Sequence, residues 1–345
     1  MTPRNLIKSA LRAINALGVD GTPTSDQHQD ALEILNLMLD SWSAEELLPF
    51  DYVQENFDLT AGKTNYTIGN ATTAADADGI CASQTPNAGG SQDLTLNGAL
   101  AESGSVSMDV PRHVVIASAG DDSGRTFTIT GTNTYGDSIT EEITGPNTTT
   151  VYGTKQFKTV TTVNVDDDTA GAITVGTDSV VDTRRPLMVV SAFVRDSSGN
   201  DYPVYPSSRE KYNTQTDKDA TTTSGSEITQ LYYDRTYPTG EIYIYKVPSA
   251  SGFTMYIDMW QPFQQIGSDD IDTALNLPGE YILALRWNLA AELAPEYGKE
   301  VREFVFLRAE STMEAVRKIN ARQPKPTILQ PPLSSVEGQA AVNRN

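Results

Sequence analysis

The longest helical pattern in the sequence lies near its end, from Pro278 to Arg322. Apolar residues recur there at steps of three and four, the spacing of one face of an α-helix. The stripe, which includes two polar positions, consists of Tyr281, Ile282, Leu285, Leu289, Leu293, Val301, Phe304, Val305, Arg308, Thr312, Val316 and Ile319. Because a proline removes one backbone hydrogen bond, Pro295 is expected to kink or split the helix near Ala294. With nearly collinear halves the element would span roughly 65 Å.

Two further helical patterns open the chain, at residues 2–17 and 25–46. Thr24 and Gln27 fit a capping box at the start of the second one. A short turn that contains glycine and proline joins the two patterns, which predicts a helical hairpin. We expect its apolar stripes to be buried in a bundle with the C-terminal helices.

Strand-like alternation begins after the second helical pattern. Residues 51–68 alternate around the turn Ala61-Gly62-Lys63, which predicts a β-hairpin. Further alternating runs, separated by Ser-Ser-Gly-Asn and Tyr-Pro-Thr-Gly turns, lie between residues 187 and 263. These runs are expected to complete the sheet that begins at 51–68.

The segment between these strands has a different composition. Residues 70–183 hold 15 acidic and 4 basic side chains and are rich in threonine, serine and glycine. Short alternating runs separated by polar turns lie at 105–110, 113–117, 125–130, 138–143, 158–165 and 172–175. Closely spaced short strands with polar turns are typical of an all-β sandwich.

These patterns predict an α+β fold with an inserted domain. Residues 1–69 and 184–322 would form the core, a helical bundle with an antiparallel sheet, and residues 70–183 an inserted, Ig-like β-sandwich. Insertion into a surface loop costs little, since the entropy of loop closure grows slowly with length. Residues 323–345, with prolines at 324, 326, 331 and 332, are expected to form an extended arm.

Charge and cysteine content exclude several classes of protein. The net charge is −20, and a dedicated DNA-binding module needs clustered lysine and arginine. Cys81 is the only cysteine, so no internal disulfide is possible. No apolar run approaches the ~18 residues that a membrane-spanning helix needs. The first residues read as a helix rather than a signal peptide, and the composition suits a cytoplasmic product.

Residue types that often carry chemistry lack the spacing that chemistry requires. His28 and His113 have no cysteine or second histidine at metal-ligand spacing, so we expect no metal site. Gly62-Lys63-Thr64 resembles the last three residues of a phosphate-binding loop, but the glycine that begins such a loop is absent. The lone Cys81 gives little support for a cysteine–histidine dyad. The sequence therefore predicts no enzyme and no cofactor.

Four other groups of residues could carry a function by their type. The acidic runs 166–168 and 269–272 are interpreted as solvated turns or a helix cap rather than calcium loops. Glu45 and Glu46 are adjacent and do not face each other on a helix, which argues against a glycosidase pair. The tyrosine-rich strands could stack on sugars, but packing in the core or between subunits is the preferred interpretation.

Basic residues gather on the C-terminal helical pattern of this acidic chain. Residues 278–322 hold 7 acidic and 7 basic side chains. We hypothesise that the basic set meets acidic partner surfaces; the alternative is a solvated helix face with local pairs such as Glu314–Lys318. Together with two prolines of the arm, the predicted interface with a partner or a neighbouring subunit is Arg302, Arg308, Arg317, Lys318, Arg322, Pro324 and Pro326.

Several phrases, in this order, resemble the head-to-tail connector proteins of short-tailed bacteriophages, also called tail accessory or packaged-DNA stabilisation proteins. The phrases are DALEILNLMLDSW (30–42), LTAGKTNYTIG (59–69), RRPLMVVSAFVRDSSGNDYPVYPSSREKY (184–212), QLYYDRTYPTGEIYIYKVPS (230–249) and LNLPGEYILALRWNLAAELAPEYG (275–298). The segment 109–146 resembles a β-sandwich module of phage structural proteins, which most connectors lack.

The resemblance implies a virion structural protein of the neck or tail, assembled in the host cytoplasm. It implies a ring of identical subunits, usually twelve, docked beneath the portal protein. Such a ring extends the DNA channel, helps to retain the packaged genome without sequence-specific binding, and offers a surface to later tail or nozzle proteins and to tail fibres. The alternative that the residues leave open is a tail-associated protein that binds glycan or hydrolyses the cell wall.

Overall fold

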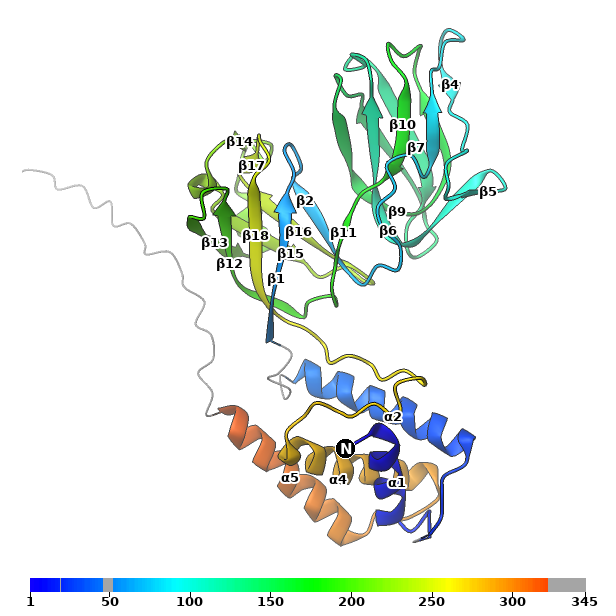
Figure 1. Ribbon diagram of the computed structural model, residues 1–345, viewed down its shortest axis with the longest axis vertical. Coiled ribbons are helices and arrows are strands. Elements are labelled where there is room, and N and C mark those ends of the chain that lie inside the picture. The colour runs from blue at the N-terminus through cyan, green and yellow to red at the C-terminus, as the bar shows by residue number, and fades with distance from the viewer. Residues whose placement is uncertain (19, 46–51, 322–345) are drawn as a thin grey trace, which may run out of the picture. The chain divides into compact units, whose positions relative to one another are not determined.

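The computed structural model describes residues 1–18, 20–45 and 52–321. Within them the chain forms two compact units (Figure 1). The first contains the described residues of 1–53, 183–188 and those from 259 onward. The second contains residues 54–182 and 189–258.

The predicted fold class, an α+β fold centred on a helical bundle, is wrong. Strands make up 36% of the described residues and helices 24%, so this part of the protein is mostly β. Five α-helices occur in the described residues, and one of them, α3 (Arg209–Asn213), is only five residues long. Each helical pattern is one long run and is therefore easy to recognise in the sequence. The many short alternating runs contribute more residues in total.

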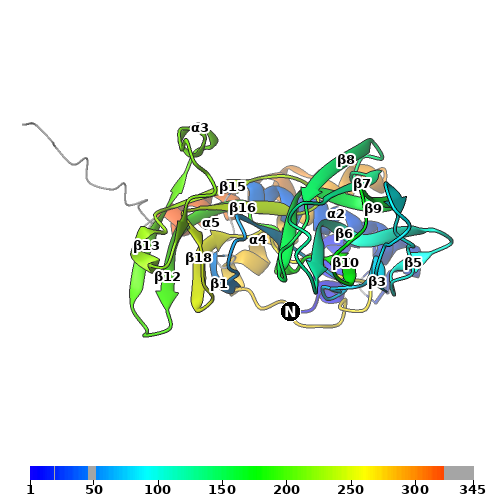
Figure 2. The same ribbon diagram turned by 90° about the horizontal axis from the view of Figure 1, so that it is seen from above.

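The first large sheet is barrel-like and nearly closed. Its strand order is β1-β18-β12-β13-β15-β16-β2-β11, and Figure 2 shows β13, β12, β18 and β1 side by side. The strands are β1 (Tyr52–Leu59), β18 (Phe253–Trp260), β12 (Met188–Asp196), β13 (Asp201–Ser207), β15 (Gln230–Asp234), β16 (Gly240–Tyr245), β2 (Asn65–Gly69) and β11 (Val180–Asp182). Strict alternation, as in β18, buries every second side chain inside the curve.

The predicted hairpin at residues 51–68 does not form. β1 lies beside β18, whereas β2 pairs antiparallel with β16 and parallel with β11. Gly62, at φ +74°, donates its N–H to the carbonyl of Pro248, so the turn is held by a distant segment. The turn was recognised correctly, but the partners of both strands lie far away in the sequence.

The second large sheet belongs to the acidic middle of the chain. Its order is β3-β10-β6-β9-β7-β8, with β4 and β5 at its margins. The strands are β3 (Cys81–Gln84), β4 (Gln92–Asp93), β5 (Ala101–Glu102), β6 (Ser105–Ser118), β7 (Thr126–Thr132), β8 (Ser138–Thr144), β9 (Thr150–Val165) and β10 (Ile173–Thr177). A separate two-stranded sheet pairs β14 (Thr221–Thr222) with β17 (Val247–Pro248).

The strands of this second sheet, β4 and β5 included, are all joined to one another by hydrogen bonds. The long strands β6 and β9 carry register shifts, and such bulges let a strand bend around a core. Phe127, Phe157 and Val163 lie fully buried in that core. A side chain at Gly131 would come within 1.9 Å of the Thr159 carbonyl oxygen, so the close approach of β7 to β9 where their register shifts requires glycine.

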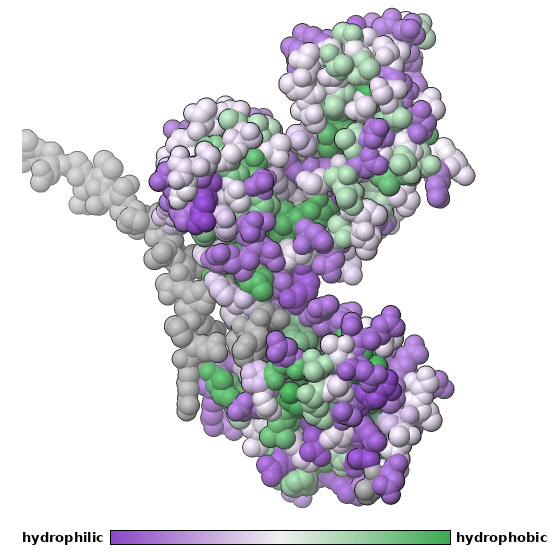
Figure 3. Space-filling view, in the orientation of Figure 1, coloured by the Kyte–Doolittle hydropathy of each residue, from purple (hydrophilic) through white to green (hydrophobic). Residues whose placement is uncertain are grey.

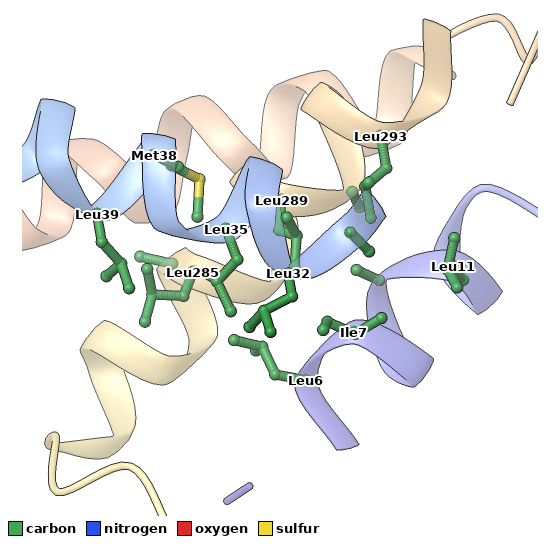
Figure 4. Packing of buried hydrophobic residues seen from close by; sticks show 14 of the residues in the cluster. Leu6, Ile7, Leu11, Leu32, Leu35, Met38, Leu39, Leu285, Leu289 and Leu293 are labelled. Atoms are coloured by element: carbon green, nitrogen blue, oxygen red, sulfur yellow. The ribbon is translucent and has the colours of Figure 1, made fainter. Parts of the chain in front are cut away.

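The remaining helices pack together in the first unit. They are α1 (Pro3–Ala13), α2 (Ser25–Ala44), α4 (Gly279–Glu296) and α5 (Glu303–Ala321). The capping box of Thr24 and Gln27 is confirmed, with both reciprocal hydrogen bonds present. Leucines from three helices, among them Leu6, Leu35 and Leu289, fill the core (Figure 4). α4 is the central helix, because α1, α2 and α5 all pack against it.

The C-terminal helical pattern is a hairpin, not one long element. α4 ends at Glu296, Gly298 adopts φ +59°, and α5 begins at Glu303. Asn288 of α4 donates to the carbonyl of Ala309, 3.3 Å away, which places the two helices side by side. The expected split of the pattern is therefore confirmed, and the span calculated for nearly collinear halves does not apply. Pro295 is accommodated in the last turn of α4, and the left-handed glycine after it ends the helix.

Candidate functional site

The structure does not bring the predicted basic residues of α5 together into one patch. Arg317 pairs at 3.1 Å with Glu45, the C-terminal cap residue of α2, and Lys318 pairs with Glu314 at 2.6 Å. Arg302 lies against the side chain of Asn15. The Glu314–Lys318 contact is the local pair that the alternative interpretation names. Arg322, Pro324 and Pro326 lie outside the described residues.

Arg308 has different surroundings, because its guanidinium lies 5.6 Å from the centre of the Phe304 ring. The buried side of α5 is formed by Val305, Ala309, Thr312 and Val316. Val301 and Phe304, which the sequence pattern assigns to the buried stripe, are exposed. The predicted helical spacing is thus correct. The residues predicted to be buried at the start of α5 are wrong, however.

Three large apolar side chains of α5 are exposed to solvent. Phe304, Phe306 and Leu307 are 58%, 58% and 53% exposed. A signal for this exposure is present in the sequence, since four consecutive apolar residues, 304–307, cannot share one face of a helix. From the sequence, a functional role is expected on this helix only for its charged residues.

Two side chains of α4 extend the apolar surface. Trp287 packs edge-to-face against Phe304 with ring centres 5.5 Å apart. Leu283, one turn earlier on α4, is 44% exposed. The Arg286 guanidinium lies 4.7 Å from the Trp287 ring centre, so cations border this surface on both helices. We call Leu283, Trp287, Phe304 and Leu307 the α5 ridge. In Figure 3, apolar green areas interrupt the polar surface of this helical unit.

A groove of about 690 Å³ runs along α2 in the same unit. Leu32 and Ile271 contribute apolar surface to it, and Leu37, 63% exposed, stands at its side. Its polar lining includes Glu33 and His28. We call this feature the α2 groove. His28, interpreted from the sequence as a structural or surface residue, therefore lies in a groove, and its pKa is lowered because the ring is partly desolvated.

The second unit contains a buried network of charged groups. Lys63 and Asp178 form an ion pair at 2.6 Å, with only 2% and 5% of their side chains exposed. Burial lowers the pKa of Lys63, and Asp178 opposes that shift. Arg112, also buried, donates to Asp109 and to the backbone carbonyl of Asp178. This network was not predicted, and the rejected Gly62-Lys63-Thr64 motif supplies its lysine.

A second buried pair lies between the two large sheets. His113 of β6 contacts Glu241 of β16 at 2.7 Å, and its ring is 3.3 Å from the Asn65 side chain of β2. Gln156 of β9 also donates to Thr67 of β2. His113 is thus a structural residue, as the sequence interpretation had it. Polar contacts, rather than a shared apolar core, connect the two sheets here.

The other candidate groups are buried or take part in hydrogen bonds and ion pairs within the fold. Cys81 is fully buried, and desolvation raises the pKa of its thiol to about 12, which disfavours the reactive thiolate. The run 166–168 accepts hydrogen bonds from the backbone of Gly89 and Gly90. Asp272 of the other acidic run pairs with Arg4 at 2.6 Å. In the described part of the chain no cluster of three or more His, Cys, Asp or Glu residues could hold a metal ion.

Two tyrosines of the predicted sugar-stacking strands, Tyr232 and Tyr243, pack on each other and on Tyr212 of helix α3. The rings of Tyr212, Tyr232 and Tyr243 lie 5.7–5.8 Å apart beside a small pocket of about 280 Å³. The Tyr243 hydroxyl donates to Glu241, and burial raises the pKa of that phenol well above its usual value. These rings therefore continue the polar connection around His113 rather than present free faces.

Comparison with known proteins gives a family. The model of the SU10 adaptor protein family matches residues 141–327, more than half of the chain. The chain belongs to the SU10 adaptor protein family. The matched segment begins in β8 and includes the whole α4–α5 hairpin. No curated protein matches the chain.

Membership of this family indicates a phage adaptor with a structural role in the virion, in contact with other phage structural proteins. It therefore supports the general part of the resemblance noted from the sequence. Among the helices of the described residues, none is both long and apolar enough to cross a membrane.

Proposed function

We propose that this adaptor forms a ring of identical subunits under the portal protein, where it extends the DNA channel and provides the attachment site for the tail. The observation that carries the proposal is the family match, which covers the α4–α5 hairpin and most strands of the barrel-like sheet. The resemblance to connectors of short-tailed phages adds a ring number of about twelve. No catalytic step is part of the proposal.

The helical unit supplies the surfaces that such a ring requires. A closed ring of identical subunits uses two different surfaces of each subunit, because every contact is head-to-tail. The exposed α5 ridge and the α2 groove are two such surfaces on different helices. The basic residues Arg302, Arg308, Arg317 and Lys318 are proposed to contribute to contacts with the portal or a neighbouring subunit.

The charge of the protein suits a channel through which DNA slides. With a net charge of −20, most of the surface repels phosphate, and the DNA is neither held nor read by base contacts. Retention of the genome would then rest on closure of the channel by the ring and the proteins attached below it. Tail or nozzle proteins and tail fibres are the proposed partners on that side.

The test is reconstitution with the portal protein of the same phage. Purified adaptor mixed with portal should give particles with an added ring in negative-stain images, and mass measurement gives the number of subunits. A portal with its adaptor-facing surface truncated is the control. Absence of any portal complex would reject the proposal, and release of soluble fragments from peptidoglycan would favour the cell-wall alternative.

A further inference from the structure

The chain passes between the barrel-like sheet and the second sheet twice. It leaves β2 at Gly69 and enters β3 at Cys81, and it returns from β10 to β11 through residues 178–179. We call residues 70–76 the first linker and residues 178–179 the second linker. Bodies joined by such linkers move relative to each other unless a large apolar interface holds them, so the contacts of the linkers decide how freely the second sheet can swing.

Arg112 of β6 contacts both linkers at once. Its side chain is only 2% exposed, and its guanidinium donates to the backbone carbonyl of Thr73 in the first linker at 2.6 Å and to that of Asp178 in the second at 3.0 Å. Its Nε donates to Asp109 at 3.0 Å. A guanidinium is planar and carries its N–H donors in a fixed geometry, so the groups that it binds are held in fixed positions relative to one another.

Asp109 holds the first linker from the other side. Its Oδ2 accepts hydrogen bonds from the backbone N–H of Thr72 at 2.8 Å and of Thr73 at 3.0 Å. In a regular strand two residues three positions apart point to opposite faces. The register of β6 against β9 shifts between Ser107 and Arg112, however, and such a bulge redirects side chains. This irregularity lets Asp109 and Arg112 meet at the linkers.

The second linker is bound to both sheets through Asp178. Its backbone N–H donates to the carbonyl of His113 in the second sheet at 2.9 Å, and its carboxylate forms the buried ion pair with Lys63, next to β2. The Lys63 ammonium also lies 4.5 Å from the ring centre of Tyr66 in β2 and 5.4 Å from that of Tyr152 in β9. Rotation of one sheet against the other would therefore separate buried charges from their partners, which is costly.

We infer that Arg112 and Asp109 form a clamp on both linkers that makes the second sheet a rigid extension of the barrel-like sheet. A displacement of the outer end of the second sheet is then passed on to the barrel-like sheet instead of being absorbed by the linkers. Direct contacts between the sheets, such as that of Gln156 with Thr67, are polar and can be replaced by contacts with water. The clamp lies within one subunit, so it acts whether or not the subunits form a ring.

Distances between spin labels on the two sheets test the clamp. Asn56→Cys on β1 and Glu142→Cys on β8 provide two exposed labelling positions, and Cys81 takes no label because it is fully buried. The labelled full-length chain is diluted with unlabelled chain, so that the measured distances lie within one subunit. The expected result is a single narrow distance distribution, which Arg112→Gln should replace by a broad one. A broad distribution without the Arg112 substitution would overturn the inference.

Two variants serve as controls. Arg125 precedes β7 of the same sheet, but its ion pair with Asp167 is partly exposed, so Arg125→Gln should leave the distribution narrow. Gln156→Ala removes a direct contact between the sheets that does not involve the linkers, and it should also leave the distribution narrow. If Gln156→Ala broadens the distribution as much as Arg112→Gln does, the interface between the sheets sets their orientation and the clamp does not.

A second pair of labels separates a loosened clamp from an unfolded domain. Ser107→Cys and Glu142→Cys both lie at exposed positions of the second sheet. Their distance distribution should stay narrow in Arg112→Gln, because that variant changes the orientation of the sheet and not its internal pairing. If this pair broadens as well, Arg112→Gln has disturbed the sheet itself, and Asp109→Asn, which keeps the arginine, takes its place in the same measurement.

Proteolysis of the first linker gives a readout that needs no labels. Proteinase K should cut the linker slowly in the unchanged chain, and mass spectrometry locates the cut. Asp109→Asn should raise the rate of this cleavage about tenfold, since the loss of a hydrogen bond to a charged group changes the population of the open linker by roughly that factor. An unchanged rate, or an equal increase in Arg125→Gln, would contradict the clamp.

Discussion

At the scale of single residues, the second unit depends on charges that are buried and paired. Lys63 and Asp178 are both almost completely buried, and removing one member of such a pair leaves the other charge uncompensated. Asp178→Asn should therefore lower the free energy of unfolding by about 3–5 kcal/mol. Urea denaturation followed by circular dichroism measures the loss.

The exposed pair of Arg195 and Asp201 is the control for Asp178. Its side chains are 42% and 46% exposed, so solvent screens the pair and Asp201→Asn should lower the stability far less than Asp178→Asn does. The double change Lys63→Met with Asp178→Leu should recover much of the stability, because it removes both charges together. Equal effects of Asp178→Asn and Asp201→Asn would contradict a special role for burial.

The surroundings of Asp109 lead to a prediction about how the stability of the fold depends on pH. Burial raises the pKa of its carboxyl, but hydrogen bonds from Arg112 and from backbone N–H groups outweigh this and hold the pKa well below its ordinary value. A depressed pKa stabilises the fold fully above the unfolded value of about 3.9, and that stability is lost as the pH falls towards the folded value. Asp109→Asn should lower the melting temperature at pH 7 and make it fall less steeply below about pH 4. Parallel melting curves over that range would refute the assignment.

At the scale of elements, local sequence signals predict helix ends and turns better than they predict which strands pair. The capping box at Thr24 and the turn at Gly62 were both readable, because each depends on a few neighbouring residues. The pairing of β1 with β18, about 200 residues away in sequence, has no local signal. The predicted runs 105–110 and 113–117 form one strand, β6, which accommodates Pro111 where the register shifts.

The candidate site was predictable only in part, because it too depends on contacts between distant segments. The sequence placed basic residues on the last helix, but their dispersal depends on the packing of α5 against α4. Periodicity assigned Phe304 to the core, and only the folded hairpin exposes it. The buried network around Lys63 joins segments more than 100 residues apart, which no local pattern reveals.

The end of α4 provides a prediction at the same scale. Gly298, and not Pro295, is expected to set the turn of the hairpin, because its φ of +59° is costly for other residues. Gly298→Ala should lower stability by about 1 kcal/mol, while Pro295→Ala should leave it unchanged or raise it. Thermal unfolding of both variants measures the difference. The reverse order would show that the proline ends the helix.

At the scale of the whole molecule, the acidic middle segment is proposed to be a separable domain. The contacts between its sheet and the barrel-like sheet are made by polar groups, among them His113, Glu241, Gln156 and Thr67. Polar groups uncovered by a deletion can be hydrated, whereas an uncovered apolar core would drive aggregation. The segment has its own apolar core, which includes Phe127 and Phe157.

Replacing residues 71–177 by a short Gly/Ser linker should therefore leave the rest of the chain folded and able to bind the portal. The deletion keeps β11, which pairs with β2, and keeps Asp178 as the partner of Lys63. It removes 13 acidic and 4 basic side chains, so the product is less acidic but still negatively charged. Cooperative unfolding and ring formation on the portal are the measurements. Because Asp178 is retained, an unfolded or aggregated product could not be blamed on an unpaired Lys63, and it would mean that the barrel-like sheet needs its neighbour for stability.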